Sequence, residues 1–220
     1  MKVNLDVPIY KQGKDKPYCG YVAMRMVMAH YGTLFKSNLA IIRAINKQLR
    51  HILPKHKRPG YYAMGLALFA LQQGYDVEVI TYNRQLYTKD IIHVTNKIKQ
   101  LAYVNKIPLD FKWREDEVNL IRNFIKPGGR LQIKIVTKED LLQYLANKNP
   151  VILAVQTDAI WDNRRADKHF VVLRGFDGKN FIINDSNSYH DDVAKVTPDD
   201  LMYAIHNNFG YVLAIKPKKK

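Results

Sequence analysis

Residues 12–32 read QGKDKPYCGYVAMRMVMAHYG and contain the one cysteine of the chain, Cys19. After this cysteine, apolar side chains recur at spacings of three and four residues, which is typical of a helix with one buried face. Gly32 stands where helices commonly end. We therefore expect Cys19 at, or just before, the first turn of a half-buried helix.

A thiol in that position suits nucleophilic chemistry. The free N–H groups and the positive dipole end of a helix N-terminus favour the thiolate, and the thiolate is the nucleophile. Gln12, seven residues upstream, has a side-chain amide that can donate to a developing oxyanion. A lone cysteine is most often a small buried hydrophobic residue, however, and this alternative stays open at this point.

The composition indicates a globular protein with a real core. The chain has 220 residues, of which 47% are hydrophobic, and it shows no clear linker or internal repeat. We expect one domain over 1–220, with a helical half at about 12–128, a β half at about 129–215 and a basic tail at 216–220. A single cysteine excludes an internal disulfide, and no apolar run reaches the length of a signal peptide or membrane span. We therefore expect a cytoplasmic protein.

The formal net charge of +15 favours acidic partners. The positive residues are scattered, and no helix-turn-helix, zinc-finger or RNA-binding signature accompanies them. We therefore expect a solvated lysine-rich surface and no nucleic-acid site.

Periodicity predicts the following elements. Helices are predicted over 38–53, 61–73, 89–105, 114–126 and 138–148, and a further helix begins at Thr197-Pro198. Strands are predicted over 3–10, 75–82, 131–136, 151–156 and 211–215. The helix at 61–73 is apolar nearly all round, so we expect it to be buried.

The clearest hairpin is HFVVLRGFDGKNFIIND, residues 169–185. His169 starts its first strand and Asp185 ends its second, so the two residues meet at one edge of the sheet. A cysteine, a histidine and a carboxylate that orients the imidazole form the nucleophile, base and orienter set of acyl transfer.

The turn of this hairpin leaves two alternatives for the residue that orients His169. A two-residue turn at Asp177-Gly178 would place Asn184 on the same face as the histidine. A three-residue loop with a bulge would place Asp185 there instead. Both side chains are chemically able to orient an imidazole, so Asn184 is kept as the fallback.

Four motifs in order carry a resemblance to a known family. They are Gln-x6-Cys-Gly at 12–20, PVIL at 150–153, HFVVL at 169–173 and IIND at 182–185. Together they resemble the C39 and C39-like cysteine peptidases, which have the papain-like fold. The segment GLALFALQQGYDVEVI, residues 65–80, is also similar to a standalone C39-like branch that is not fused to a transporter. Residues 89–135 are poorly covered by the resemblance.

The resemblance implies a papain-like α+β fold, in which a helical half packs against an antiparallel β-sheet half. It implies Cys19 as nucleophile, His169 as base and then acid, and Asp185 as orienter. Gln12 and the backbone N–H of Cys19 would form the oxyanion hole. The substrate would be a peptide or protein, cleaved through a thioester with no metal or organic cofactor. The oligomeric state stays open.

Two departures from the family pattern stand near these residues. Tyr21 follows Cys19-Gly20 where the family often has proline or a small residue, so it would either narrow the pocket or repack the helix start. Ser186 stands where the family usually has proline.

Two other functions use the same residues. One is an acyltransferase that passes the Cys19 thioester to an amine. The other is a peptide-binding module without turnover, for which we expect an unreactive Cys19 and salt-sensitive binding to an acidic partner.

The remaining histidines are not expected in the catalytic site. His30 lies about three helical turns from Cys19, or ~16 Å, which is too far for its base. His51 and His56 have no cysteine or acidic ligand near them in sequence, so no metal site is expected. His190, followed by two aspartates, indicates a solvated loop better than a cation site.

Two further features lie near these motifs. Trp161, in the polar loop before His169, would either wall a substrate cleft or simply pack. Gly128-Gly129 resembles a double-glycine cleavage site but more simply makes a turn between a helix and a strand.

Overall fold

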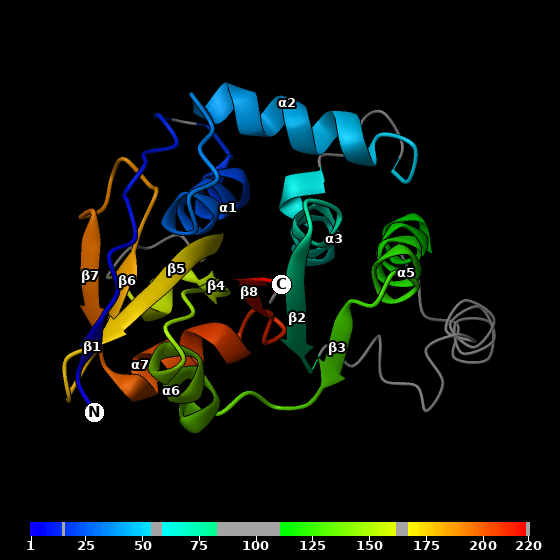
Figure 1. Ribbon diagram of the computed structural model, residues 1–220. Helices are drawn as coiled ribbons and strands as arrows, with labels where there is room; N and C mark the ends of the chain where they lie inside the picture. The colour runs from blue at the N-terminus through cyan, green and yellow to red at the C-terminus, as the bar shows by residue number, and fades with distance from the viewer. Residues whose placement is uncertain (15, 54–58, 83–110, 162–166, 219–220) are drawn as a thin grey trace.

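The computed structural model describes residues 1–14, 16–53, 59–82, 111–161 and 167–218 (Figure 1). The helix predicted at 89–105 and the basic residues 55–58 lie outside these ranges. In the described part, a large sheet has helices on both faces.

The sheet contains eight strands in the order β3-β2-β8-β4-β5-β6-β7, with β1 paired to β5. Their bounds are β1 Val3–Asn4, β2 Tyr75–Thr81, β3 Arg130–Ile133, β4 Val151–Gln156, β5 Lys168–Phe176, β6 Phe181–Asn184, β7 Val193–Val196 and β8 Val212–Pro217. The antiparallel sheet expected from the sequence differs in one pair, because β2 and β3 run parallel. A long connection that includes a helix separates these two strands, as parallel pairing requires.

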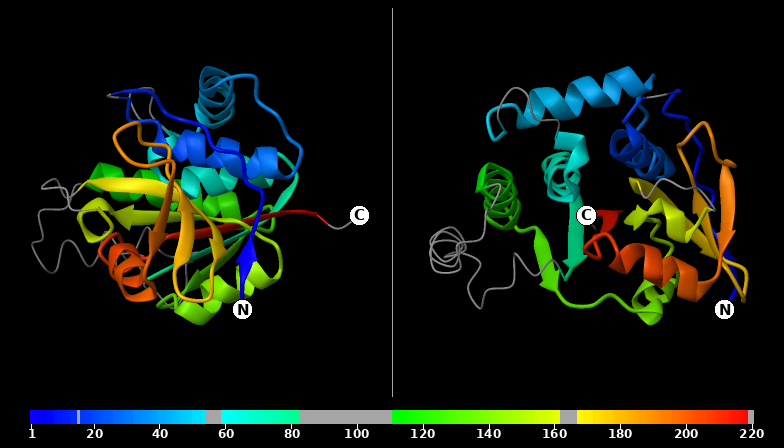
Figure 2. Two further views of the ribbon diagram at one scale, coloured as in Figure 1. Left: turned by 90° about the vertical axis from the view of Figure 1, so that its left-hand side faces the viewer. Right: turned by 180° about the vertical axis from the view of Figure 1, so that it is seen from behind.

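Helices form layers above and below the sheet (Figures 1 and 2). Their bounds are α1 Cys19–His30, α2 Asn38–Leu49, α3 Ala63–Gln72, α5 Phe111–Ile125, α6 Lys138–Ala146 and α7 Pro198–His206, with short 3-10 helices at Pro59–Tyr61 and Thr157–Ala159. On one face α1 packs on β5 and α3 packs on β2, while α6 and α7 cover the other face. The helix that begins with Cys19 therefore lies directly on the strand that carries His169.

The helix starts predicted at residues 38 and 138 and at Thr197-Pro198 are confirmed. Ser37 Oγ accepts a hydrogen bond from the Ala40 N–H. Thr137 and Asp140 form a reciprocal capping box. Thr197 caps the helix that has Pro198 in its first turn.

The helix predicted at 61–73 begins at Ala63, and its residues through Leu71 are buried, as expected from its apolar sequence. Its side chains belong to one hydrophobic core that also contains α1 and the central strands. Among the residues placed by the structure, no helix is both long and apolar enough to cross a membrane.

Two strand predictions differ from the structure. Only Val3–Asn4 of the strand predicted at 3–10 lies in the sheet. Pro8, which has no N–H to donate, lies in the part that does not pair as a strand. β7 was not predicted, because its four residues, VAKV, give no strong alternation.

Candidate active site

Cys19 is the first residue of α1, as the sequence predicted. Tyr18 at the N-cap makes no side-chain capping bond, and no acidic residue lies in the first turn. The backbone N–H groups and the positive helix end therefore face an otherwise uncapped position, which favours an anion. The thiol is free and partly buried.

The glycine that follows Cys19, Gly20, is explained by the close approach of another backbone segment. A Cβ at Gly20 would lie 2.2 Å from the carbonyl oxygen of Gly60. A Cβ at Gly60 would in turn lie 2.5 Å from the ring of Tyr21. Tyr21 is fully buried, and its hydroxyl donates to Asn46 Oδ1 at 2.8 Å. Of the two roles left open for Tyr21, the structure therefore shows the packing one.

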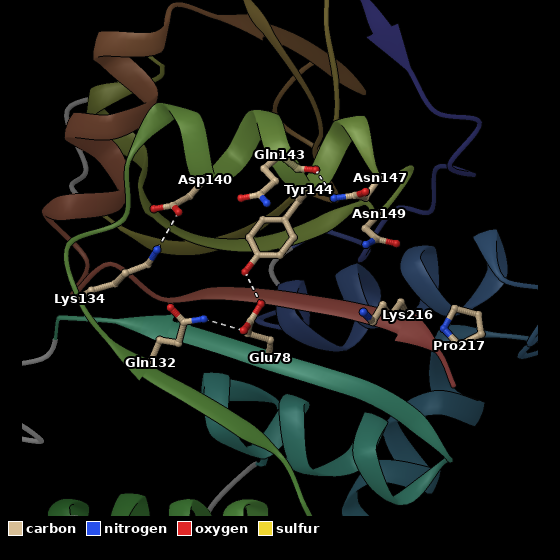
Figure 3. Close-up of a pocket in the computed structure, with 10 residues that line it drawn as sticks. All are labelled: Glu78, Gln132, Lys134, Asp140, Gln143, Tyr144, Asn147, Asn149, Lys216 and Pro217. Carbon is tan, nitrogen blue, oxygen red and sulfur yellow. Dashed lines mark hydrogen bonds and ion pairs between the residues drawn. The ribbon is translucent and has the colours of Figure 1, made fainter. Parts of the chain in front are cut away.

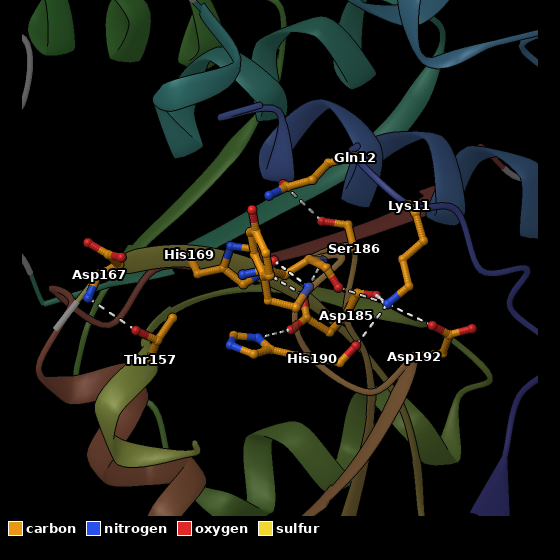
Figure 4. A network of polar contacts seen from close by, with 11 residues as sticks. Lys11, Gln12, Thr157, Asp167, His169, Asp185, Ser186, His190 and Asp192 are labelled. Atoms are coloured by element: carbon orange, nitrogen blue, oxygen red, sulfur yellow. Dashed lines mark hydrogen bonds and ion pairs between the residues drawn. The ribbon is translucent and has the colours of Figure 1, made fainter. Parts of the chain in front are cut away.

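His169 and Asp185 meet at the end of the β5–β6 hairpin (Figure 4). The distance between His169 Nε2 and Asp185 Oδ1 is 2.6 Å, and both side chains are buried. Because an ionised carboxylate can only accept, Nε2 carries the hydrogen of this bond. The other ring nitrogen, Nδ1, is left for the Cys19 thiol.

A bulge at Arg174 decides which residue faces His169. Phe176 pairs with Phe181 across a four-residue turn, and the pairing shifts between Leu173 and Gly175. Leu173 therefore pairs with Ile183, and by alternation Asp185 shares the face of His169. Neither turn weighed from the sequence is present: the turn is longer, and the bulge lies within β5.

The fallback residue, Asn184, points to the other face of the sheet. Its Nδ2 donates to the carbonyl oxygen of Val7 at 3.0 Å. It therefore tethers the N-terminal segment to β6 instead of contacting the histidine.

Ser186, at the position where the family usually has proline, connects the hairpin to Gln12. The Gln12 backbone N–H donates to the Ser186 carbonyl at 2.8 Å. The Ser186 hydroxyl donates to Gln12 Oε1 at 3.4 Å. The Gln12 amide nitrogen has no acceptor among the residues that the structure describes. Its N–H groups are thus left to donate elsewhere.

The electrostatic effects in the site act together. Burial alone would raise the pKa of the Cys19 thiol, but the positive charge and hydrogen bond of His169 hold that pKa below its ordinary value. Burial alone would lower the pKa of His169, but the facing thiolate and the Asp185 carboxylate raise it. Burial also opposes ionisation of Asp185, yet its bond with His169 keeps its pKa low. The arrangement therefore favours a thiolate, an imidazolium and a carboxylate.

Two residues outside the predicted Cys-His-Asp set lie against the His169–Asp185 pair. His190 Nδ1 donates to Asp185 Oδ2 at 2.7 Å, and the His190 side chain is only 12% exposed. The prediction that His190 lies in a solvated loop is therefore wrong for its side chain, which is largely buried. Trp161 stacks on the His190 ring at 4.2 Å between centroids and meets the His169 ring edge-on at 6.3 Å. No sequence pattern links these loops, because folding alone brings them together.

The other histidines and the double glycine considered from the sequence do not belong to the His169–Asp185 site. The distance between His30 Nδ1 and the carbonyl oxygen of Asp6 is 2.7 Å. His51 is exposed, and His56 lies outside the described residues. Gly128 has a φ of +97° in the turn between α5 and β3. Within the described ranges, no group of three or more His, Cys, Asp or Glu side chains could hold a metal ion.

A polar pocket lies away from this site, between α6 and strands β2, β3 and β8 (Figure 3). Its polar groups largely satisfy each other. Glu78 accepts hydrogen bonds from Tyr144 and Gln132, each at 2.7 Å, and Lys134 pairs with Asp140 at 2.7 Å. It shares no residue with the Cys19 site.

The solved structures with the same fold include two that match over nearly the full length of the chain. One is the peptidase domain of Streptococcus ComA, a bifunctional ABC transporter involved in quorum sensing, with a TM-score of 0.52 and 16% identity over 96% of this chain and 98% of that chain. The other is a Bacillus anthracis protein described as a C39-like peptidase, with a TM-score of 0.57 and 14% identity over 100% of both chains. These likenesses confirm the papain-like fold. No curated protein sequence matches the chain.

The sequence agrees with this fold across nearly its full length. The model of the Peptidase_C39 like family matches residues 4–212, which include Gln12, Cys19, His169 and Asp185. The chain belongs to the Peptidase_C39 like family.

Proposed function

We propose that this protein is a cysteine peptidase that hydrolyses amide bonds of peptides through a Cys19 thioester. The observation that carries the proposal is the position of the buried His169. Its Nε2 lies 2.6 Å from the Asp185 carboxylate, and its interaction with Cys19 lowers the pKa of the thiol and raises the pKa of the imidazole. Family membership and the papain-like fold support the same reaction class.

The first half of the reaction forms the thioester. The Cys19 thiolate attacks the carbonyl carbon of the scissile amide. The Gln12 amide and the Cys19 backbone N–H donate to the oxyanion. The imidazolium of His169 then gives its Nδ1 proton to the leaving amine, the C–N bond breaks, and the acyl group stays on sulfur.

The second half regenerates the enzyme. Nδ1 of His169 takes a proton from a water molecule, and the hydroxyl attacks the thioester carbonyl. The C–S bond breaks, a carboxylic acid leaves, and the thiolate–imidazolium pair re-forms. Asp185 orients the ring in both halves through its bond to Nε2. Every step uses groups of this chain and water.

The first test is the rate of Cys19 alkylation by iodoacetamide as a function of pH, in wild type and in His169→Ala. A thiolate–imidazolium pair reacts at pH values well below ~8.5, the pKa of a free thiol. We expect the loss of the histidine to move the alkylation profile to higher pH. His51→Ala, at an exposed position, is the matched control and leaves the profile in place. Folding of each variant is checked by circular dichroism.

A second step tests turnover with a fluorogenic peptide library, and Cys19→Ser is its control. Cleavage that requires Cys19 and His169 supports the peptidase. Product that forms only when an amine is added indicates the acyltransferase instead. A Cys19 that stays inert in the folded protein contradicts both enzymes and favours the binding module.

A further inference from the structure

We infer that His190 is a positioning residue for the triad: it holds the Asp185 carboxylate from the side opposite His169. This inference rests on the proposed function, because it assigns a role within the same site. The geometry that supports it is a single buried carboxylate shared by two imidazoles.

The Asp185 carboxylate is fully buried and receives a donor at each oxygen. Oδ1 accepts from His169 Nε2 at 2.6 Å and from the Asn187 N–H at 2.8 Å. Oδ2 accepts from His190 Nδ1 at 2.7 Å, and no other described residue donates to it. The two imidazole rings are nearly perpendicular, at 89°, with centroids 6.5 Å apart. With both oxygens bound, the carboxylate has one orientation.

His190 is itself held in place on two sides. Its ring stacks on Trp161 with an interplanar angle of 14°. Its backbone carbonyl accepts from Lys11 Nζ at 3.2 Å, and the same ammonium binds the Asn187 carbonyl at 2.8 Å. Figure 4 shows Lys11, Asp185 and His190 close together at the loop after β6. A ring fixed in this way is suited to holding a neighbouring group.

The charged groups around His190 come from three segments. Asp185 and His169 lie on the hairpin, Lys11 lies on the N-terminal segment, and Asp192 pairs with Lys11 at 2.7 Å. Because Lys11 is already neutralised by Asp192, the carboxylate of Asp185 interacts mainly with the two histidines.

Loss of the His190 donor leaves a buried carboxylate oxygen without a partner. Such an atom is costly, so the carboxyl group either rotates towards another donor or takes up a proton. Rotation weakens the hydrogen bond between Asp185 Oδ1 and His169 Nε2, and protonation removes the negative charge, so in both cases the imidazolium of His169 is stabilised less. The Cys19 thiolate is then stabilised less, although neither catalytic side chain has changed.

The test compares two isosteric replacements by the pH profile of Cys19 alkylation. His190→Phe keeps a ring on Trp161 but removes the donor, and we expect alkylation below the profile midpoint to slow roughly tenfold. His190→Asn places an amide N–H where Nδ1 lies, and we expect it to recover most of the rate. His51→Phe, at an exposed histidine, is the matched control.

Two further variants separate the proposed role of His190 from a loss of folding or an effect independent of His169. His190→Gln puts its amide nearer the Nε2 position, so it serves as a second variant without the donor and replaces the phenylalanine if that protein does not fold. In a His169→Ala background, His190→Phe has no further effect, because His190 acts through His169.

An unchanged profile in the variants without the donor overturns this inference, as does an equal effect in the His169→Ala background or a failure of asparagine to recover the rate. In these cases the proposed function still stands if wild type reacts as a paired thiolate. A wild-type Cys19 that titrates as a free thiol overturns both proposals together.

Discussion

At the level of single residues, opposing effects meet on Cys19. Burial disfavours a thiolate, and the positive charge of His169 is the largest of the effects that reverse that preference. The helix N-terminus lowers the cost of the negative charge, but its contribution falls off within one turn. The reactivity of this thiol therefore depends on His169, which lies 150 residues further along the chain.

Gln12 gives a prediction that separates oxyanion binding from thiol activation. Gln12→Ala removes the proposed oxyanion donor, which makes no contact with the His169–Asp185 pair, so we expect kcat to fall by roughly 10²–10³ while the Cys19 alkylation profile stays in place. The measurement is steady-state cleavage of a fluorogenic peptide beside alkylation. Ser186→Ala, which removes only the 3.4 Å bond to Gln12, is the matched control with a much smaller loss. A shifted alkylation profile in Gln12→Ala would argue against the oxyanion role.

At the level of elements, the approach of α1 and α3 to the turn at Pro59–Tyr61 positions the thiol. Both helices carry a glycine where the turn comes close. A Cβ at Gly20 would lie 2.2 Å from the Gly60 carbonyl, and a Cβ at Gly65 would lie 2.3 Å from the Pro59 carbonyl. The contacted atoms belong to the backbone of the turn, which cannot move aside as easily as the end of a flexible side chain.

These two glycines form a matched pair of substitutions. Gly20→Ala and Gly65→Ala each overpack the same turn, and we expect each to lower the free energy of unfolding by about 1–3 kcal/mol. Only Gly20→Ala displaces the residue next to Cys19, so only this variant changes the alkylation profile. Urea unfolding and alkylation measure the two effects. The explanation fails if Gly20→Ala unfolds at the wild-type midpoint.

Many of the helices were predictable because the sequence features that specify them are local. Helix caps at Ser37, Thr137 and Thr197, and the all-apolar helix at 63–72, depend on residues within a few positions of each other. The parallel pairing of β2 and β3 depends on a connection of nearly fifty residues, whose path no short pattern specifies.

The residues of the candidate site could be proposed from the sequence, but the register of the β5–β6 hairpin that brings two of them together could not. Cysteine, histidine and carboxylate follow from their order and from a resemblance, but the choice between Asp185 and Asn184 depends on the bulge at Arg174. Gly175, next to Arg174, is a local sign of a bulge, but a glycine in a strand equally indicates a close backbone approach, and Val3 does approach Gly175. His190 and Trp161 approach Asp185 and His169 only through tertiary folding. From the sequence, a place at the cleft was one of two alternatives for Trp161, and His190 was expected in a solvated loop.

At the level of the whole molecule, one buried acid links stability to pH. Burial raises the pKa of Glu117 to about 7, against the opposing effect of the Tyr211 hydroxyl that donates to it at 2.6 Å. Asp116 next to it acts in the same direction as burial. The folded protein thus holds this proton more tightly than the unfolded chain, so stability is greatest below the unfolded pKa and is lost as the pH rises to about 7.

Glu117→Gln removes this dependence. The amide oxygen still accepts from Tyr211, but no buried charge forms at high pH. Between pH 5 and pH 8, we expect wild type to lose on the order of 3 kcal/mol of unfolding free energy relative to Glu117→Gln. Urea unfolding at the two pH values measures the difference, and Glu139→Gln at an exposed position is the control. Parallel pH dependences for wild type and Glu117→Gln would exclude a buried titrating acid here.

The contacts of Lys11 have a consequence for the order in which the protein is made. This side chain and its neighbours bind residues 174–179 positions later in the chain. At roughly 5–20 residues per second, the ribosome needs on the order of 10–30 s to travel from Cys19 to His169. During that time the nascent chain carries the nucleophile without its base. A chain that stops before β5 therefore carries Cys19 without the histidine that favours its thiolate, and the proposed thiolate–imidazolium pair can form only after β5 has been synthesised.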